Sequence, residues 1–276
     1  MTPKKVIAMK GDKTMPSQTA LITGATSGIG YELAKIFAEH HYNLIIVSRT
    51  RTELEQTARE LGERYSVEVT PIEKDLFLRE SPFELYQEIA ARGIMVDVLV
   101  NDASQGLYGR FIDTDIEKEL DMLQLNIGAY LVLTKLFLRE MVRRNQGKIL
   151  NVASIASKLP GPYQSVYHGT KAFIHSFTEA IRAEISGSGV TITSLLPGAT
   201  DTDFFHKAHM EESKMLDQKL SDPAKVARDG FNALMAGDDM VISGMKYKAQ
   251  IAASNITPDH IVAKGMLKQQ EPRKNN

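Results

Sequence analysis

Short apolar stretches alternate with segments of helical periodicity along most of this chain, and this alternation limits the possible folds more than any other feature. Residues 19–23 are largely apolar, which is typical of a strand buried on both faces of a parallel sheet, whereas residues 66–72 alternate apolar and polar. Six strand–helix repeats predict an α/β fold in which helices cover both faces of a doubly wound parallel sheet. The expected strands are residues 19–23, 43–48, 66–72, 96–100, 147–152 and 190–196, with a short seventh at 240–243.

The helical segments include one unusually long pattern, from residue 113 or 114 to about 144, and another at 163–186. A last helix is expected at about 258–268. Neither an internal linker nor a sequence repeat divides the 276 residues, so a single domain is predicted.

The domain is expected to span residues 19–270, between a flexible polar arm at 1–18 and a polar tail at 271–276. Residues 203–221 are rich in Met, His and Lys and show no strand pattern. This segment is predicted to be a mobile loop over the substrate.

Composition excludes several classes of function. The chain has no Cys, which rules out disulfides, thiolate metal sites and cysteine nucleophiles. A net charge of −1 indicates neither a nucleic-acid nor a membrane partner. The longest apolar stretch, 127–138, contains Lys135 and is shorter than the roughly 20 residues that span a bilayer. The N-terminus lacks the apolar stretch of a secretory signal, so a cytoplasmic location is expected.

Glycines and polar residues follow the predicted strands where each strand ends, and ligands of open α/β sheets lie beyond those ends. Gly24, Gly28 and Gly30 follow the first strand and open a helix, where free N–H groups and the helix dipole attract a phosphate. The spacing is not G-x-G-x-x-G, but the physical reason for the glycines is the same. The sequence therefore predicts a dinucleotide site in a Rossmann-type sheet.

The end of the second strand indicates which dinucleotide binds. It reads Ser48-Arg49, with Arg51 nearby and no acidic residue before Glu53. A carboxylate here would bind a ribose 2′-hydroxyl, whereas a guanidinium can bind a 2′-phosphate with two bonds. We therefore expect NADP(H), with NAD(H) as the alternative.

Tyr167 and Lys171 are four residues apart, so a helix would place both on one face with Cβ atoms roughly 5–6 Å apart. Tyrosine has a pKa of about 10, and a proton-transfer group works best when its pKa lies near the operating pH. A positive charge about 4 Å away supplies roughly the 4 kcal/mol needed for such a shift. The pair could perform acid–base chemistry without a metal, although Y-x-x-x-K alone is usually an ordinary surface pair.

Six motifs follow one another along the chain: Thr23-Gly-Ala-Thr-Ser-Gly-Ile-Gly30, Asn101-Asp-Ala-Ser104, Asn126, Ser154, Tyr167-x-x-x-Lys171 and Pro197-Gly198. In order and spacing, with Ser154 thirteen residues before Tyr167, they resemble the short-chain dehydrogenase/reductase family. The resemblance covers about residues 19–243 and implies an enzyme that transfers a hydride between a nicotinamide and a carbonyl or secondary alcohol. The ending at residues 197–205 looks like bacterial members whose substrates are mostly unassigned.

The resemblance implies a role for each catalytic residue. Tyr167 would exchange a proton with the substrate oxygen, and Lys171 would lower its pKa and bind the nicotinamide ribose. Ser154 would stabilise charge on the substrate oxygen, and Asn126 would hold a water that links Lys171 to solvent.

The same resemblance implies where the cofactor binds. Asp75 and Leu76 would flank the adenine, and Thr202 would contact the carboxamide. The complete implied set of cofactor-binding residues is Gly24, Thr26, Ser27, Gly28, Ile29, Gly30, Ser48, Arg49, Asp75, Leu76, Asn101, Ala103, Tyr167, Lys171, Pro197, Gly198 and Thr202.

Two residues depart from the family pattern, because Asp102 and Ser104 stand where Asn and Gly are usual. Other readings of the chain are an NAD-linked alcohol dehydrogenase, a non-enzymatic NADP(H)-binding regulator and a sugar-nucleotide epimerase or dehydratase. His206 and His209 lie three residues apart without a third ligand nearby, so no metal site is expected and the histidines are expected at the surface. Family members commonly form homodimers or homotetramers through the helices that correspond to 115–144 and 163–186, and a small molecule is the expected substrate.

Overall fold

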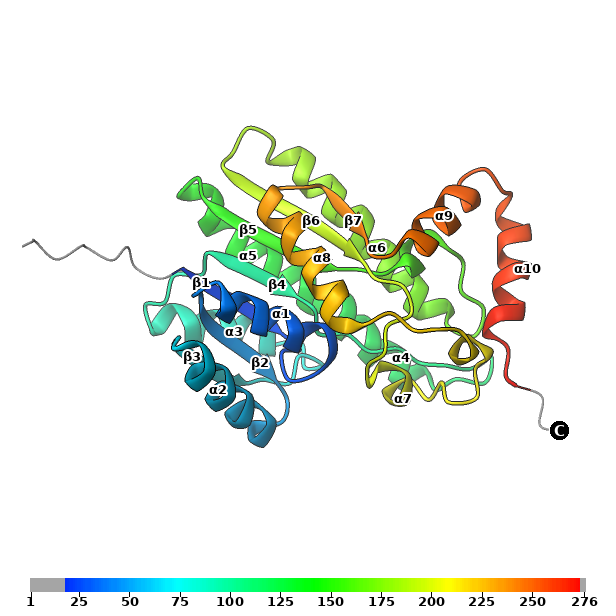
Figure 1. The fold of residues 1–276 in the computed structure, drawn as a ribbon, viewed down its shortest axis with the longest axis horizontal. Coiled ribbons are helices and arrows are strands. Elements are labelled where there is room, and N and C mark those ends of the chain that lie inside the picture. Colours follow the sequence, from blue (N-terminus) through cyan, green and yellow to red (C-terminus); the bar gives the residue numbers. More distant parts are fainter. Residues whose placement is uncertain (1–17, 274–276) are drawn as a thin grey trace, which may run out of the picture.

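Seven strands form one parallel sheet in the order β3-β2-β1-β4-β5-β6-β7, which confirms the predicted doubly wound fold (Figure 1). The structure is a computed structural model that describes residues 18–273; most of the predicted arm (1–17) and part of the predicted tail (274–276) lie outside the described residues. The strands are β1 (Thr19–Thr23), β2 (Asn43–Ser48), β3 (Val69–Glu73), β4 (Val98–Asn101), β5 (Gly147–Val152), β6 (Val190–Leu196) and β7 (Met240–Ile242).

The strand order reverses between β1 and β4. From β1 the chain moves outward through β2 to β3, then returns to β4 on the other side of β1 and continues outward to β7. Ile22 of β1 pairs with Val100 of β4, so the ends of these two strands lie next to each other. Such a reversal opens a crevice at the carboxyl edge of the sheet, which is where ligands of this fold class bind.

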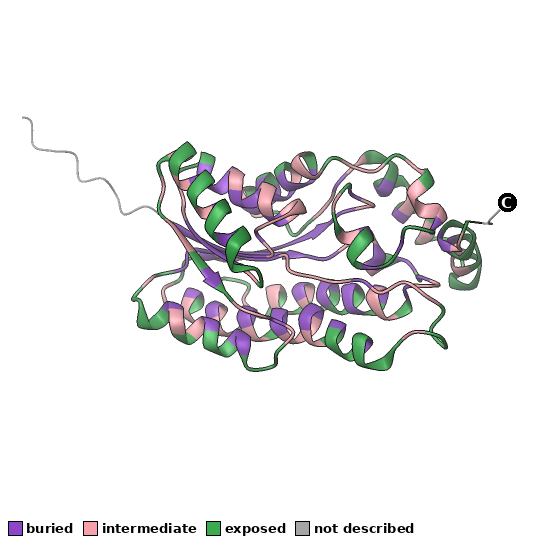
Figure 2. Cartoon of the chain, turned by 90° about the horizontal axis from the view of Figure 1, so that it is seen from below, coloured by how far each residue is buried: buried purple, intermediate pink, exposed green. Residues whose placement is uncertain are grey.

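Helices cover both faces of the sheet, and buried residues concentrate between the two helical layers (Figure 2). On one face, Phe37 packs edge-on against Phe231, with ring centroids 5.0 Å apart. That layer contains α1 (Gly28–Glu39), α2 (Arg51–Tyr65) and α8 (Pro223–Ala236). The opposite layer contains α3 (Ser81–Ala91), α5 (Tyr130–Arg143) and α6 (Ser165–Glu184).

The long helix expected up to residue 144 is divided into three parts. It consists of α4 (Ile116–Leu123), a π-helical segment (Gln124–Ala129) and α5. An apolar period near 3.6 does not distinguish a π turn from continuous α-helix. Such turns occur frequently at functional sites, and this one contains Asn126.

The C-terminal region contains more helix than the sequence predicts. The helix expected at about 258–268 is present as α10 (Asp259–Gln270), and α9 (Met245–Ser254) precedes it without having been predicted. The predicted loop at 203–221 contains α7 (Phe204–Lys207) and a 3-10 turn (Lys214–Asp217). The mobility of this loop stays a prediction.

Gly169 lies in the interior of α6 on its exposed side, and a Cβ built there meets no atom within 4 Å. Glycine inside a helix costs about 0.5–1 kcal/mol relative to alanine. Gly169→Ala is therefore expected to raise the free energy of unfolding by about that amount, measured by urea denaturation. A lower free energy of unfolding would contradict the open space described at this position.

Candidate active site

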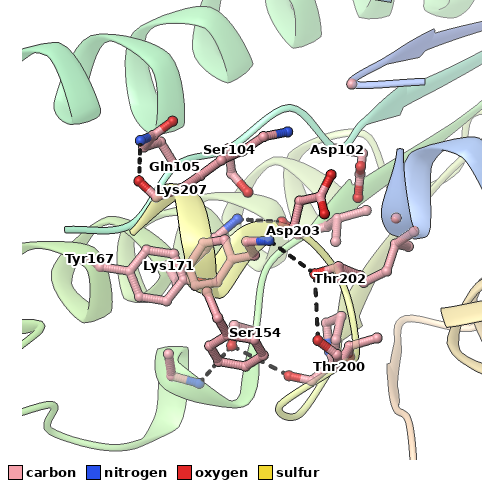
Figure 3. Close-up of a pocket in the computed structure, with 18 of the residues that line it drawn as sticks. Asp102, Ser104, Gln105, Ser154, Tyr167, Lys171, Thr200, Thr202, Asp203 and Lys207 are labelled. Atoms are coloured by element: carbon pink, nitrogen blue, oxygen red, sulfur yellow. Dashed lines mark hydrogen bonds between the residues drawn. The ribbon is translucent and has the colours of Figure 1, made fainter. Parts of the chain in front are cut away.

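The carboxyl ends of the strands surround a cavity of about 350 Å³. Figure 3 shows part of this cavity, with Ser154, Tyr167 and Lys171 among the side chains around it. The cavity places together most of the residues expected from the sequence. The predicted residues that line it are Gly24, Thr26, Ser27, Gly28, Ile29, Ser48, Arg49, Leu76, Ala103, Ser154, Tyr167, Lys171, Pro197, Gly198 and Thr202.

Four predicted residues do not line the cavity. Asn101 is wholly buried, and its amide donates to Thr134 and to Asn151. The Asp75 carboxylate accepts from the N–H of Phe77 at 3.1 Å. Of the other two, Gly30 lies beneath the glycine loop and Asn126 lies in the π-helical segment.

The glycine loop joins β1 to α1 and requires glycine for two different reasons. Gly24 and Gly28 have φ values of 72° and 58°, a region that disfavours other residues. A Cβ on Gly30 would lie 2.3 Å from the carbonyl oxygen of Gly24, so the loop and the helix approach too closely for any side chain. Ser27, the N-cap of α1, makes no side-chain cap hydrogen bond, which leaves the start of this helix available to an anion.

Arg49 stands at the far end of the cavity, where β2 ends. Its side chain is exposed, and Cζ lies 4.8 Å from the ring centroid of Phe77. Arg51, in contrast, is paired with Glu55 at 3.1 Å. The guanidinium of Arg49 is therefore the one beside the cavity.

Lys171 is almost completely buried, although it carries an ammonium group. Nζ donates to the carbonyl of Val152 at 2.9 Å and lies 5.8 Å from the ring centroid of Tyr167. Burial lowers the pKa of Lys171 to about 8, and the carboxylate of Asp102 opposes this shift. One of its three N–H donors is thus used by the protein backbone, and the others remain for a ligand.

Tyr167 lies between the hydroxyl of Ser154 and the aromatic ring of Phe204. Its ring centroid is 5.1 Å from that of Phe204. Burial raises the pKa of Tyr167 well above its usual value, and the hydrogen bond with Ser154 lowers it. The sequence led us to expect a lowered pKa, but the degree of burial at this position is not visible in the sequence.

Ser154 is held by the backbone around it. Its hydroxyl accepts from the N–H of Ala156 at 3.1 Å and donates to the carbonyl of Pro197 at 3.3 Å. These contacts connect the end of β5 to the end of β6. The hydroxyl is therefore fixed beside Tyr167 rather than free to rotate into solvent.

Asn126 already uses most of its side-chain hydrogen-bonding capacity. Its amide donates to the carbonyl of Gln105 at 2.9 Å and to the hydroxyl of Thr170 at 3.1 Å. Its carbonyl oxygen accepts from the N–H of Gln105 at 3.0 Å. A water held by Asn126 would therefore have to bind its backbone carbonyl or the remaining lone pair on its side-chain oxygen, Oδ1.

The two departures from the family pattern both lie at the cavity (Figure 3). Asp102 accepts a backbone hydrogen bond from Gly30, which a carboxylate can do as well as an amide. Burial raises the pKa of the Asp102 carboxyl to about 7, while Lys171 lowers it. Ser104 also lines the cavity.

Sequence reasoning missed the residues that close the cavity on its other side. His168 and His175 are buried in α6; His168 lines the cavity, and Nδ1 of His175 lies 3.2 Å from the hydroxyl of Ser194. The C-terminal helices contribute Tyr247, Met266 and Gln270 to the lining. Apolar residues within a helix can indicate that it packs against another surface, but they do not show that this surface is the cavity. Within residues 18–273, no group of three or more His, Asp or Glu side chains could hold a metal ion.

The sequence model described as short chain dehydrogenase matches residues 18–213, most of the chain. The chain belongs to the short-chain dehydrogenase family. It is therefore an oxidoreductase of a family that transfers hydride. In the part of the chain that the structure describes, no helix is long and apolar enough to cross a membrane.

Two curated relatives illustrate the range of the family. The very-long-chain 3-oxoacyl-CoA reductase of Anas platyrhynchos is 36% identical over 184 residues, which cover 64% of this chain and 58% of that protein. This short-chain dehydrogenase thus spans little more than half of that relative. An uncharacterized oxidoreductase of Staphylococcus epidermidis is 28% identical and matches 74% of this chain and 88% of its own length.

Solved structures agree with the fold. A short-chain dehydrogenase from Sphingobium yanoikuyae in complex with NADPH has a TM-score of 0.79 and 23% identity, covering 94% of this chain and 98% of that one. An alcohol dehydrogenase from Thermococcus sibiricus, complexed with 5-hydroxy-NADP, has a TM-score of 0.72 and 27% identity. That match covers 82% of this short-chain dehydrogenase and 95% of the archaeal chain.

Proposed function

We propose that this enzyme is an NADP(H)-dependent oxidoreductase that interconverts a carbonyl compound and its secondary alcohol. The observation that carries the proposal is the position of Ser154, Tyr167 and Lys171 at one cavity, with the glycine loop at the same cavity. Hydride transfer to or from the substrate carbon is the chemistry that a bound nicotinamide cofactor supplies.

The residues of this chain suit that cofactor. The uncapped start of α1 and the positive φ angles of the glycine loop provide backbone N–H groups for phosphate. Lys171 has free donors for a ribose hydroxyl, and Arg49 lies beside the cavity for a 2′-phosphate. The structures complexed with NADPH and with 5-hydroxy-NADP support the choice of NADP(H) over NAD(H).

In the proposed reaction, Tyr167 holds the proton that the substrate oxygen gains on reduction or loses on oxidation. Ser154 has one O–H, which donates to the carbonyl of Pro197 at 3.3 Å; on substrate binding it would turn to the substrate oxygen and stabilise the charge that develops there. The positive charge of Lys171 favours the phenolate against the effect of burial. A water on Asn126 would return the proton from solvent through Lys171.

Cofactor preference depends on Arg49 in this proposal. Arg49→Ala is expected to weaken NADPH binding about 10- to 100-fold, because a hydrogen bond to a charged group contributes about 1.5–3 kcal/mol. Binding of NADH, which lacks the 2′-phosphate, should change little. Fluorescence titration of both cofactors checks this, with Arg51→Ala as the matched control that should leave both affinities unchanged. Unaltered NADPH preference in Arg49→Ala would contradict the role of Arg49 and favour the NAD-linked alternative.

The substrate is proposed to be a small, largely apolar carbonyl compound. Leu159, Phe204 and Met215 line the cavity around Tyr167. The 36% sequence identity to a very-long-chain 3-oxoacyl-CoA reductase agrees with a ketone substrate. Turnover of a panel of ketones and alcohols, monitored by NADPH absorbance, tests this assignment. Tight NADPH binding without turnover of any compound in the panel would favour the non-enzymatic regulator.

We also propose a homodimer or homotetramer formed through α4, α5 and α6. These helices expose Leu120, Leu131 and Phe173 to 49%, 37% and 40%, and Phe173 stacks on Phe177. Phe173→Asp is expected to shift the protein to a smaller species in light scattering coupled to gel filtration. The proposal fails if the unaltered protein is monomeric at micromolar concentration.

A further inference from the structure

The C-terminal end of α10 forms part of the cavity wall, in a region beyond the residues that match the family model. Gln270, the last residue of α10, is completely buried. Its backbone carbonyl accepts hydrogen bonds from the hydroxyls of Tyr108 and Ser213. Lys214 and Glu271 form an ion pair next to it. The backbone of Gln270 is thus held in place at the cavity wall.

The amide of Gln270 faces His168, the neighbour of Tyr167 in sequence. Nδ1 of His168 lies 2.7 Å from the carbonyl oxygen of Leu159. A carbonyl can only accept, so Nδ1 carries the hydrogen. Burial lowers the pKa of His168, although backbone hydrogen bonds with Leu159 and Ala156 oppose this shift. In the neutral ring, Nε2 is the acceptor. Nε2 of Gln270, 3.2 Å away, donates to it.

This orientation leaves the carbonyl oxygen of the Gln270 side chain, Oε1, without His168 as a partner, in a residue that lines the cavity. Oε1 is buried and has no hydrogen-bond partner among the described residues. The neighbouring amide on this wall, Gln164, donates to the sulfur of Met210 and does not supply one. A buried acceptor without a donor is unfavourable, and a ligand that brings a donor relieves that cost.

We propose that Gln270 is a specificity-determining residue, whose Oε1 accepts a hydrogen bond from a hydroxyl or amide N–H of the substrate at a distance from the reacting carbonyl. The substrate class is then a neutral ketone with a second, hydrogen-bond-donating group, because His168, Gln164 and Gln270 present no charge on this wall. The inference rests on the proposed function, since Tyr167 defines the reacting end of the cavity.

The test uses pairs of ketones that differ in one group. Each pair has a hydroxyl or a methyl group at the same carbon, and the series varies the number of carbons between that group and the carbonyl. The unaltered enzyme is expected to prefer the hydroxyl member at one spacing by about tenfold or more in kcat/KM, mainly through KM. Gln270→Met, which keeps the length of the side chain but removes the acceptor, should abolish the preference. Gln56→Met, on the exposed side of α2, is the matched control and should retain it.

The outcomes separate this inference from the proposed function. Turnover of ketones without a preference for the hydroxyl member at any spacing overturns the role of Gln270 and leaves the proposed function intact. An unchanged preference in folded Gln270→Met, with folding checked by NADPH binding, also overturns it. Turnover that persists in Tyr167→Phe would instead contradict the proposed function.

Discussion

Tyr167→Phe is expected to lower kcat by about 10²–10⁴, the usual contribution of a positioned acid–base group. The substitution removes only the hydroxyl that Ser154 contacts, and the ring keeps its packing against Phe204. Affinity for NADPH should therefore stay close to that of the unaltered enzyme. Steady-state NADPH consumption and fluorescence titration on the same samples measure the two quantities separately.

Tyr65→Phe is a suitable control for that experiment. The hydroxyl of Tyr65 is buried at the end of α2 without a hydrogen-bond partner among residues 18–273, and Tyr65 does not line the cavity. Removing this hydroxyl should leave kcat unchanged and should not reduce stability. Equal activity in Tyr167→Phe and Tyr65→Phe would rule out Tyr167 as the proton-transfer group.

Gly30→Ala should weaken NADPH binding on the order of 10- to 100-fold and destabilise the fold by about 1–3 kcal/mol. The added Cβ would lie 2.3 Å from the carbonyl oxygen of Gly24 and 2.6 Å from Oδ2 of Asp102. Because one of these atoms belongs to the backbone, the glycine loop or the start of α1 has to move. Calorimetric titration with NADPH and urea denaturation measure the two effects.

Gly62→Ala provides the comparison. A Cβ on Gly62, within α2, would lie 3.4 Å from its nearest neighbour, the carbonyl oxygen of Val67. That is close to an ordinary contact, so both cofactor affinity and stability should be nearly preserved. If Gly30→Ala binds NADPH as well as Gly62→Ala does, the close approach of loop and helix is not required for binding.

The sheet was predictable because its central strands are buried on both faces. β1, for example, is buried at every position, and such strands form continuous apolar runs that stand out from helical periodicity. The glycine loop and Ser154 were found for a related reason. They follow the ends of parallel strands, which one sheet brings to one edge, and the Tyr167/Lys171 pair was found by its spacing from Ser154.

The remaining features depend on contacts between distant parts of the chain. The contact between Tyr108 and Gln270 joins residues 162 positions apart, and nothing local in α10 indicates that it reaches the cavity. The π-helical segment around Asn126 has the same apolar pattern as the helices on either side. The raised pKa of Tyr167 results from burial by Phe204 and its surroundings, which no spacing within α6 reveals.

The central claim is that this chain transfers a hydride from NADPH to a ketone with Tyr167 supplying the proton. Reduction of a ketone panel with NADPH deuterated at the transferred position, followed by mass spectrometry of the products, tests it most directly. We expect one deuterium on the carbinol carbon with the unaltered enzyme and a product yield lower by about 10²–10⁴ with Tyr167→Phe. Alcohol without deuterium, or equal yields from both enzymes, would contradict it.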